Sequence, residues 1–136
     1  MASSSKRKFK SLIPLATILV LSGAVGILIS IYNNRQALSN NNALALQGES
    51  LYIKHCASCH GKNLEGQPNW KTRNENSRLP APPHDETGHT WHHDDQLLFE
   101  LTKFGMVPPN IPEGYESDMP AYENILSDDE IWAVLY

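Results

Sequence analysis

Cys56-Ala57-Ser58-Cys59-His60, followed directly by Gly61, is the stretch on which the interpretation of this 136-residue chain depends. Two cysteines three positions apart with a histidine directly after them form the attachment motif of a c-type haem. Each thiol can add to one vinyl group of the porphyrin, and the adjacent imidazole then lies beneath the iron. Five residues can match by chance, so the rest of the chain has to supply a second axial ligand, a pocket and a suitable compartment.

Two other chemistries use a Cys-x-x-Cys pair. A thioredoxin-like dithiol lies near a βαβ pattern, with its first cysteine activated at a helix N-terminus. Here no strand pattern precedes the motif, and Gly48, Tyr52, Cys56 and Cys59 recur at helical spacing on one face. A zinc site would need two further ligands, which only distant histidines supply. The pattern therefore favours haem attachment at the end of a helix over about residues 44–59.

The residue after the motif, Gly61, is suited to end that helix in a left-handed conformation. Tyr52 shares the face of the two thiols and is assigned to the residues that cover the haem.

Charge is divided unevenly along the chain. Residues 1–46 contain five Lys and Arg and no Asp or Glu. From Gln47 onward the chain contains six Lys and Arg and fifteen Asp and Glu, which gives a net charge of −9. Such a segment repels nucleic acid and favours a protein partner with a basic docking surface. The alternative is that the acidic side chains serve only to keep the domain soluble.

Both cysteines of the chain lie in the motif, so no other disulfide is available.

The N-terminal region predicts a membrane anchor. Residues 1–10 form a basic leader, and residues 11–32 form a transmembrane helix, because Ser11–Ile31 contains no charge and its 21 residues reach about 30 Å, one hydrocarbon core. Lys and Arg gather on the N-terminal side, which keeps the leader cytoplasmic and exports the remainder.

A cleaved secretory signal is the alternative. Its apolar region would usually run only about 7–15 residues, and the small-x-small triplet Ala43-Leu44-Ala45 lies rather far downstream. Residues 33–46 are expected to form a polar tether, and residues 47–136 the haem domain.

Residues 62–93 are rich in Gly, Pro, Asn and other polar residues, so little regular structure is expected there. A loop of this length suits a compact domain when a covalent haem is the core around which it wraps. Three prolines, Pro80, Pro82 and Pro83, stiffen the loop, and a carbonyl among them is a candidate to accept the second ring N–H of His60. A plain rigid turn is the alternative.

Four histidines occur within ten residues of this loop: His84, His89, His92 and His93. They are expected to be surface groups or neighbours of the haem propionates, and a second metal site is the alternative because imidazole is a common ligand. Trp91 lies among them and is assigned to the cofactor site as an indole N–H donor to a propionate, with buried packing as its alternative.

Two further helices are predicted from their caps. Asp94 is the N-cap of a helix over about residues 95–104, which Gly105 ends. Ser127-Asp128-Asp129-Glu130 is a capping box that opens the last helix. Only about nine residues follow before Tyr136, which is short for an independent helix, and the natural chain is expected to extend further.

Two methionines follow the motif and compete for the second axial position. A thioether is a soft, neutral ligand, and its pairing with His raises the haem potential. Met119 is favoured because Pro120 stiffens its extended segment and the intervening chain is long enough to reach the opposite haem face. Met106 directly follows the second helix and is expected to pack in the core. An open or His-ligated iron is the remaining alternative.

These features together resemble class I cytochromes c over about residues 47–136. The residues that carry the resemblance are Gly48, Tyr52, the Cys56–Gly61 motif, the later proline, Met119-Pro120-Ala121-Tyr122 and Leu126–Trp132. The resemblance implies an all-α cytochrome c fold, with about three to four helices around one covalent haem c, here preceded by the N-terminal transmembrane helix.

The resemblance also implies particular contacts. The N- and C-terminal helices of the domain should cross in close contact at Gly48, and the iron should be ligated by His60 and Met119. The ring of His60 should bond to the carbonyl of Pro82 or Pro83.

The expected function is single-electron transfer by a membrane-tethered monohaem cytochrome rather than enzymatic catalysis, since no nucleophile–base motif occurs. The expected location is a bacterial inner membrane, crossed once, with the haem domain on the periplasmic side. Partners would be redox proteins and membrane lipid, and no nucleic acid. The alternatives are a haem subunit of a larger membrane oxidoreductase and a haem-based gas or redox sensor.

Overall fold

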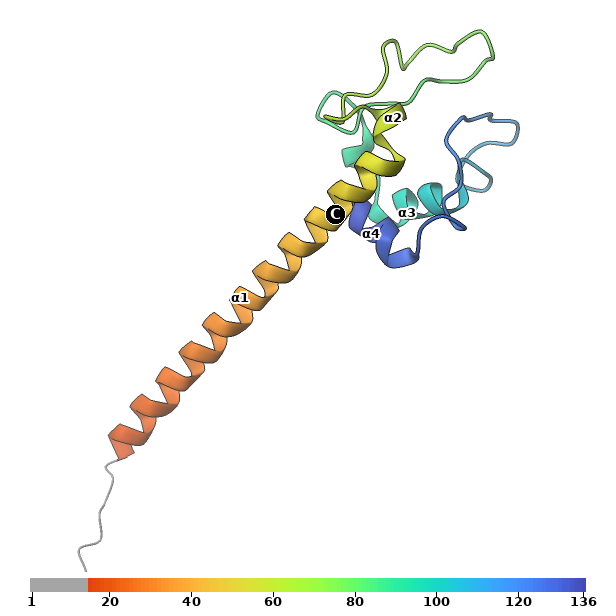
Figure 1. Ribbon diagram of the computed structural model, residues 1–136. Coiled ribbons are helices and arrows are strands. Elements are labelled where there is room, and N and C mark those ends of the chain that lie inside the picture. The colour runs from red at the N-terminus through yellow and green to blue at the C-terminus, as the bar shows by residue number, and fades with distance from the viewer. Residues whose placement is uncertain (1–14) are drawn as a thin grey trace, which may run out of the picture. The chain divides into compact units, whose positions relative to one another are not determined.

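The computed structural model describes the backbone of residues 15–136 and contains helices joined by loops (Figure 1). The helices are α1 (Leu15–His55), α2 (Ala57–His60), the 3-10 helix η1 (Thr90–His92), α3 (Asp95–Phe104) and α4 (Asp128–Leu135). The described residues include no strand, so the predicted all-α class is confirmed. The described part of the chain divides into two units, residues 15–40 and 41–136.

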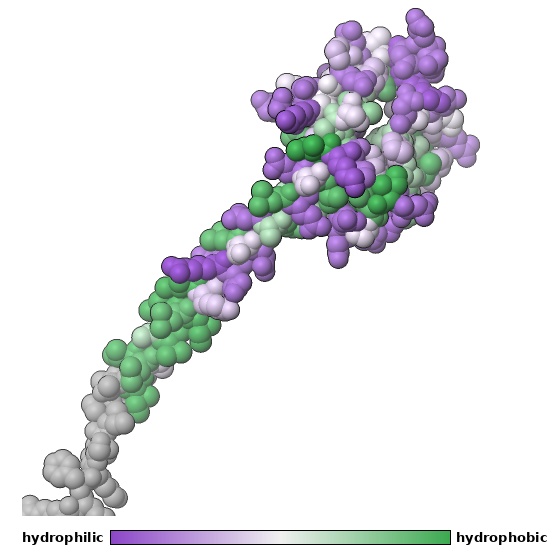
Figure 2. Space-filling model, viewed as in Figure 1, coloured by the Kyte–Doolittle hydropathy of each residue, from purple (hydrophilic) through white to green (hydrophobic). Residues whose placement is uncertain are grey.

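The first unit contains the N-terminal part of α1, whose apolar side chains are exposed. Val20 is 71% exposed and Leu28 65%, and Figure 2 shows hydrophobic residues along this stretch. The predicted leader over residues 1–10 and the start of the anchor predicted over 11–32 lie outside the described residues. In the part of the chain that is described, no helix is both long enough and apolar enough to cross a membrane.

Residues 33–46, predicted to be a polar tether, are helical and belong to α1. No proline or glycine interrupts the chain between Gly26 and Gly48, and Ala, Leu and Gln in this stretch are good helix formers. A polar composition therefore did not break the helix here, because a helix satisfies its own backbone hydrogen bonds.

The predicted helix over about residues 44–59 is divided at Cys56. This residue leaves regular geometry, with φ −118° and ψ −38°, before the short helix α2. Hydrogen bonds from the Cys56 N–H to the Tyr52 carbonyl (2.8 Å) and from the His60 N–H to the Cys56 carbonyl (2.9 Å) continue the helical path. The two thiols therefore keep near-helical spacing at the end of α1.

The second unit has a small apolar core formed by α1, α3, α4 and the segment before α4. The buried cluster is Phe99, Tyr122, Leu126 and Ile131, with Leu51, Met119 and Leu135 packed against it. Both predicted caps are confirmed: Asp94 accepts the Leu97 N–H at 2.9 Å, and Ser127 forms the capping box with Glu130.

Gly48 is a point of close contact between α1 and α4. A Cβ on this residue would lie 1.9 Å from the carbonyl oxygen of Ala133, closer than any side-chain carbon can approach. The backbones of the two helices therefore touch where only glycine fits. This is the helix crossing that the resemblance implied.

Residues 62–93 are irregular apart from η1, as predicted, but they are held by backbone hydrogen bonds. The His84 N–H donates to the Leu64 carbonyl (2.8 Å), and the Gln67 N–H donates to the Ala81 carbonyl (2.9 Å). A Cβ on Gly66 would lie 2.5 Å from the backbone nitrogen of Pro83. These contacts bring the proline stretch beside the chain that leaves α2.

Candidate haem site

The two cysteines lie at the junction of α1 and α2, and they form no disulfide. Cys56 is half-buried, and the Cys59 N–H donates to the Cys56 carbonyl at 3.0 Å. Burial, with a smaller contribution from the Cys59 thiol, raises the pKa of the Cys56 thiol. A redox dithiol instead lowers the pKa of its first thiol.

His60 ends α2 and is buried, at 7% exposure. Its Nδ1 lies 2.9 Å from the carbonyl oxygen of Pro82. Because a carbonyl only accepts, Nδ1 carries the proton and donates, which leaves the Nε2 lone pair for a metal. Of the two carbonyls that the resemblance implied, that of Pro82 makes the bond, and Pro83 is buried.

Gly61 has a φ of +83°, as a glycine that turns the chain after a helix requires. Its ψ of 149° lies outside the left-handed helical region that was predicted. The chain therefore turns away extended, and the Gly66 N–H returns to the His60 carbonyl at 2.7 Å.

His84 is a neighbour of His60 that sequence reasoning did not identify. The two imidazole rings stack with centroids 4.2 Å apart and planes 22° apart, and His84 Nδ1 lies 2.8 Å from the Thr90 hydroxyl. Burial above all, and then the proximity of His60 and His89, lowers the pKa of His84 to about 4. A neutral ring thus packs beside the proximal histidine. The one clue in the sequence is that His84 directly follows the proline pair.

Met119, the predicted second ligand, is half-buried and packs against the core cluster. Its N–H donates to the Ser117 hydroxyl at 3.0 Å. Met106 is also half-buried. These contacts do not test ligation of the iron, which stays a prediction for Met119.

Two tyrosines link the helices to the site through their hydroxyl groups. The Tyr52 hydroxyl donates to the Gly61 carbonyl at 2.8 Å, and the Tyr122 hydroxyl donates to the His55 carbonyl at 2.8 Å. Burial raises the pKa of Tyr52 to about 12, with smaller contributions from Cys56 and Glu65. Tyr52 therefore helps to hold the turn that follows the motif.

Trp91 does not pack in the interior. Its side chain is 74% exposed, so the alternative of buried packing is wrong. Its indole N–H donates to the Gly88 carbonyl at 3.2 Å. A bond to a haem propionate would have to replace that contact, and the assignment stays a prediction.

The other three histidines of the loop form a cluster of rings, in which His89 and His92 are exposed and His93 is half-buried. His89, His92 and His93 have ring centroids 4.5–5.4 Å apart, and His89 stacks on Trp70 at 5.5 Å. Among the described residues, no group of three or more His, Cys, Asp or Glu is arranged to hold a metal ion. The alternative of a second metal site therefore has no support in this geometry.

The composition of the interior fits a covalent cofactor. The buried hydrophobic residues described are Phe99, Tyr122, Leu126, Ile131 and Ala133, which is a small core for a unit of this length. A porphyrin attached at the end of α1 would supply apolar surface that the side chains do not. The free thiols and the available imidazole nitrogen provide the donors that such a group needs.

The residues of the second unit also match a known family. A family model described as "Cytochrome C oxidase, cbb3-type, subunit III" matches residues 43–136. The chain belongs to this family. The predicted resemblance to class I c-type cytochromes is thereby confirmed, and the cofactor of this cytochrome is covalently bound haem c, with Cys56 and Cys59 in the attachment arrangement. No curated protein and no solved structure matches the chain.

Family membership supports an electron-transfer role for this cytochrome, with redox proteins or the other subunits of a complex as its partners. It does not distinguish a free carrier from a subunit of an oxidase.

Proposed function

We propose that this cytochrome transfers single electrons through one haem c whose axial ligands are His60 and Met119. The haem iron supplies one-electron chemistry by cycling between two oxidation states. The observation that carries the proposal is the buried His60, whose Nδ1–H is held by Pro82 in a domain of the cytochrome family.

The protein's own groups have separate tasks in this proposal. Pro82 fixes the tautomer and the orientation of His60, so that the Nε2 lone pair would be available to hold the haem iron. Met119 offers an uncharged sulfur, and the resulting neutral ligand pair favours the reduced iron. If His60 and Met119 both hold the iron, no position would be left for a substrate.

We further propose that residues 11–32 anchor the cytochrome in a bacterial inner membrane, with the haem domain on the periplasmic side. The support is the uncharged sequence of Ser11–Ile31 and the placement of four Lys and Arg before it. The acidic domain would then approach redox proteins through a basic surface on the partner. Protease protection of the leader in sealed spheroplasts tests this orientation.

A second setting for the same chemistry is favoured by the family description, which names a subunit of an oxidase. In that case the cytochrome would deliver electrons within a stable membrane complex. Purification from native membranes in mild detergent distinguishes the two settings. A carrier is recovered alone, whereas a subunit co-purifies with a catalytic partner in fixed stoichiometry.

Spectroscopy of the purified full chain tests the electron-transfer proposal. A pyridine haemochrome spectrum should show one c-type haem per chain, and a potentiometric titration should follow a one-electron curve. Carbon monoxide should bind the reduced protein slowly and weakly, because Met119 has to leave first. Rapid, tight binding of carbon monoxide at neutral pH would instead identify a gas sensor and contradict the proposal.

A further inference from the structure

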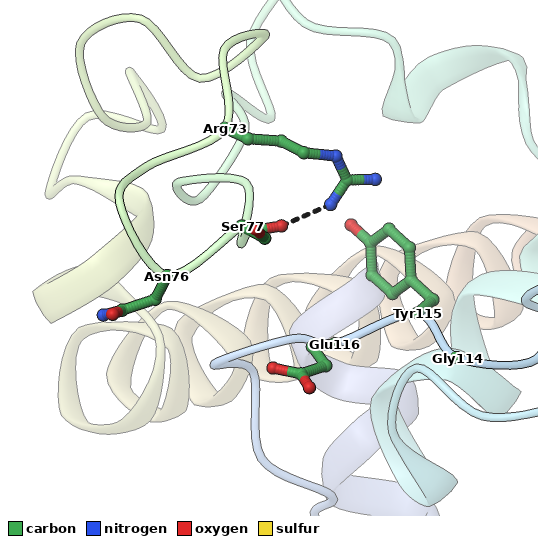
Figure 3. A pocket seen from close by; sticks show the side chains of 6 residues that line it. All are labelled: Arg73, Asn76, Ser77, Gly114, Tyr115 and Glu116. Carbon is green, nitrogen blue, oxygen red and sulfur yellow. Dashed lines mark hydrogen bonds between the residues drawn. The ribbon is translucent and has the colours of Figure 1, made fainter.

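Two loops face each other across a surface hollow in the second unit. The hollow is lined by Arg73, Asn76, Ser77, Gly114, Tyr115 and Glu116, and Figure 3 shows Arg73 and Tyr115 pointing toward each other from opposite sides. The Arg73 guanidinium lies 5.6 Å from the centre of the Tyr115 ring, within the range of a cation–π contact. The loop before the proline stretch is therefore in contact with the loop that leads to Met119.

Arg78 provides a second and stronger connection between the same loops. Its Nε lies 3.3 Å from Oε2 of Glu116, and its terminal nitrogen Nη1 is paired with Asp118 Oδ1. One guanidinium thus bridges two carboxylates that are two positions apart in the sequence. The planar guanidinium group can do this because it presents several N–H donors in a fixed arrangement.

Both ends of this bridge are held by local hydrogen bonds. The Arg78 N–H donates to Asn74 Oδ1 at 3.0 Å, and the Arg78 carbonyl accepts the Asn74 N–H at 2.8 Å. On the other loop, the Met119 N–H donates to the Ser117 hydroxyl at 3.0 Å. Because both backbones are constrained, the ion pairs cost less side-chain and loop entropy than pairs between free loops would.

The bridge connects the segment of Met119, the proposed second ligand, with the segment whose Pro82 carbonyl orients His60. Asp118 directly precedes Met119, and Arg78 lies four residues before Pro82, whose carbonyl orients His60. The prolines between Arg78 and His84 restrict the intervening backbone. A displacement of the Met119 segment would therefore have to break ion pairs anchored to the segment that holds His60.

We propose that Arg78 is a positioning residue for the Met119 ligand: its bridge to Glu116 and Asp118 holds the Met119 segment against the loop that leads to Pro82. This inference rests on the proposed ligation by Met119. The side chain of Arg78 is 36% exposed and those of its partners more than 60%, so solvent weakens each pair. The bridge acts by biasing the closed loop rather than by stabilising the whole fold.

The quantity to measure is the pH at which the Met-to-iron charge-transfer band disappears in the oxidised full chain. At alkaline pH, side chains that have lost their protons compete with the thioether for the iron and displace it. Exposed ion pairs change a local equilibrium by about two- to fivefold. For Arg78→Gln, the midpoint of the transition should therefore fall by about 0.3–0.7 pH units, and carbon monoxide should bind the reduced protein about two- to fivefold faster.

A matched control is available at another ion pair. Lys103→Gln removes the same unit of charge and breaks the pair between Lys103 and Asp128, 2.6 Å apart, which does not involve the Met119 segment. It should leave the transition midpoint and the carbon monoxide rate at the wild-type values. An equal shift in both variants would show that net charge alone is responsible, and the inference would be wrong.

A second substitution distinguishes positioning by Arg78 from an effect of net charge, through the direction in which it shifts the transition midpoint. Asp118→Asn changes the net charge in the direction opposite to Arg78→Gln, yet it breaks the same bridge and should also lower the midpoint. The double variant should shift it no further than the larger single shift. Opposite signs, or additive shifts, would overturn the inference.

The wild-type spectrum keeps this test distinct from that of the proposed function. If the wild type lacks the charge-transfer band, ligation by Met119 fails and the inference fails with it. If the band is present and Arg78→Gln leaves its pH midpoint unchanged, only the role of Arg78 is wrong.

Discussion

At the residue scale, His60 and Tyr52 show how single hydrogen bonds prepare the motif for a metal. His60 donates from Nδ1 to Pro82 and keeps Nε2 available, while Tyr52 ties α1 to the carbonyl of Gly61, the residue after the motif. The imidazole and the turn behind it are both held by main-chain oxygens. Their positions therefore depend on backbone geometry that substitution of a nearby surface side chain leaves in place.

Replacement of Tyr52 by phenylalanine should cost about 0.5–1.5 kcal/mol in the free energy of unfolding at neutral pH, because the bond to Gly61 is lost. The pKa of Tyr52 is raised to about 12 in the folded chain, above the ordinary value of about 10. The stabilisation from the neutral phenol is thus complete below pH 10 and is lost as the pH rises toward 12.

Urea unfolding of wild type and Tyr52→Phe across this range measures the effect, with the exposed Tyr136→Phe as the control. A difference between wild type and Tyr52→Phe that stays constant from pH 9 to about pH 12 would contradict the assigned titration.

Some site residues were predictable from the sequence and others were not. The Cys56–His60 motif follows from local chemistry, the resemblance implied a carbonyl of Pro82 or Pro83, and the structure has the bond to Pro82. The stacking of His84 on His60 and the exposure of Trp91 depend on how the loop returns after α2. No local pattern encodes that return, because long-range backbone hydrogen bonds determine it.

At the scale of the elements, the capped helices were predictable, whereas the continuity of α1 between the helices predicted over residues 11–32 and about 44–59 was not. The side chains of Asp94 and Ser127 satisfy N–H groups at the starts of α3 and α4, so the signal lies within three or four residues. The N-terminal extent of α1 has no comparable marker. Composition alone predicts a tether for its polar stretch over residues 33–46, but a polar composition does not by itself break a helix.

Gly48→Ala tests the contact between α1 and α4. A methyl group there would meet the Ala133 carbonyl, so the helices have to separate, and stability should fall by about 1–3 kcal/mol or more. Gly26 in the same helix faces open space, and a Cβ added there would have no atom within 4 Å. Gly26→Ala should therefore leave the unfolding of the haem domain unchanged.

Chemical denaturation followed at the haem absorbance compares the two variants with wild type. Equal midpoints for Gly48→Ala and Gly26→Ala would mean that the close helix contact does not form in solution.

At the scale of the whole molecule, charge distribution is the feature that bears on partners. Residues from Gln47 onward carry six basic and fifteen acidic side chains, a net charge of −9. Purple, hydrophilic side chains cover much of the visible face of the second unit in Figure 2. A field of this sign attracts cationic reactants and repels anionic ones over about a Debye length.

Electron exchange with small reagents should follow this field. Reduction of the oxidised cytochrome by a cationic ruthenium ammine should slow as the salt concentration rises, whereas oxidation of the reduced form by anionic ferricyanide should accelerate. Stopped-flow rates over about 0.01–0.5 M salt measure both slopes. Slopes of the same sign for the two reagents would rule out electrostatic steering by the acidic domain.

The ligand set is tested most directly by the charge-transfer band of the oxidised full chain in Met119→Ala and Met106→Ala. Ligation by His60 and Met119 predicts that Met119→Ala abolishes the band and opens the iron to carbon monoxide after reduction, while Met106→Ala retains the band. Loss of the band in Met106→Ala with its persistence in Met119→Ala would contradict the assignment and move the second ligand to Met106.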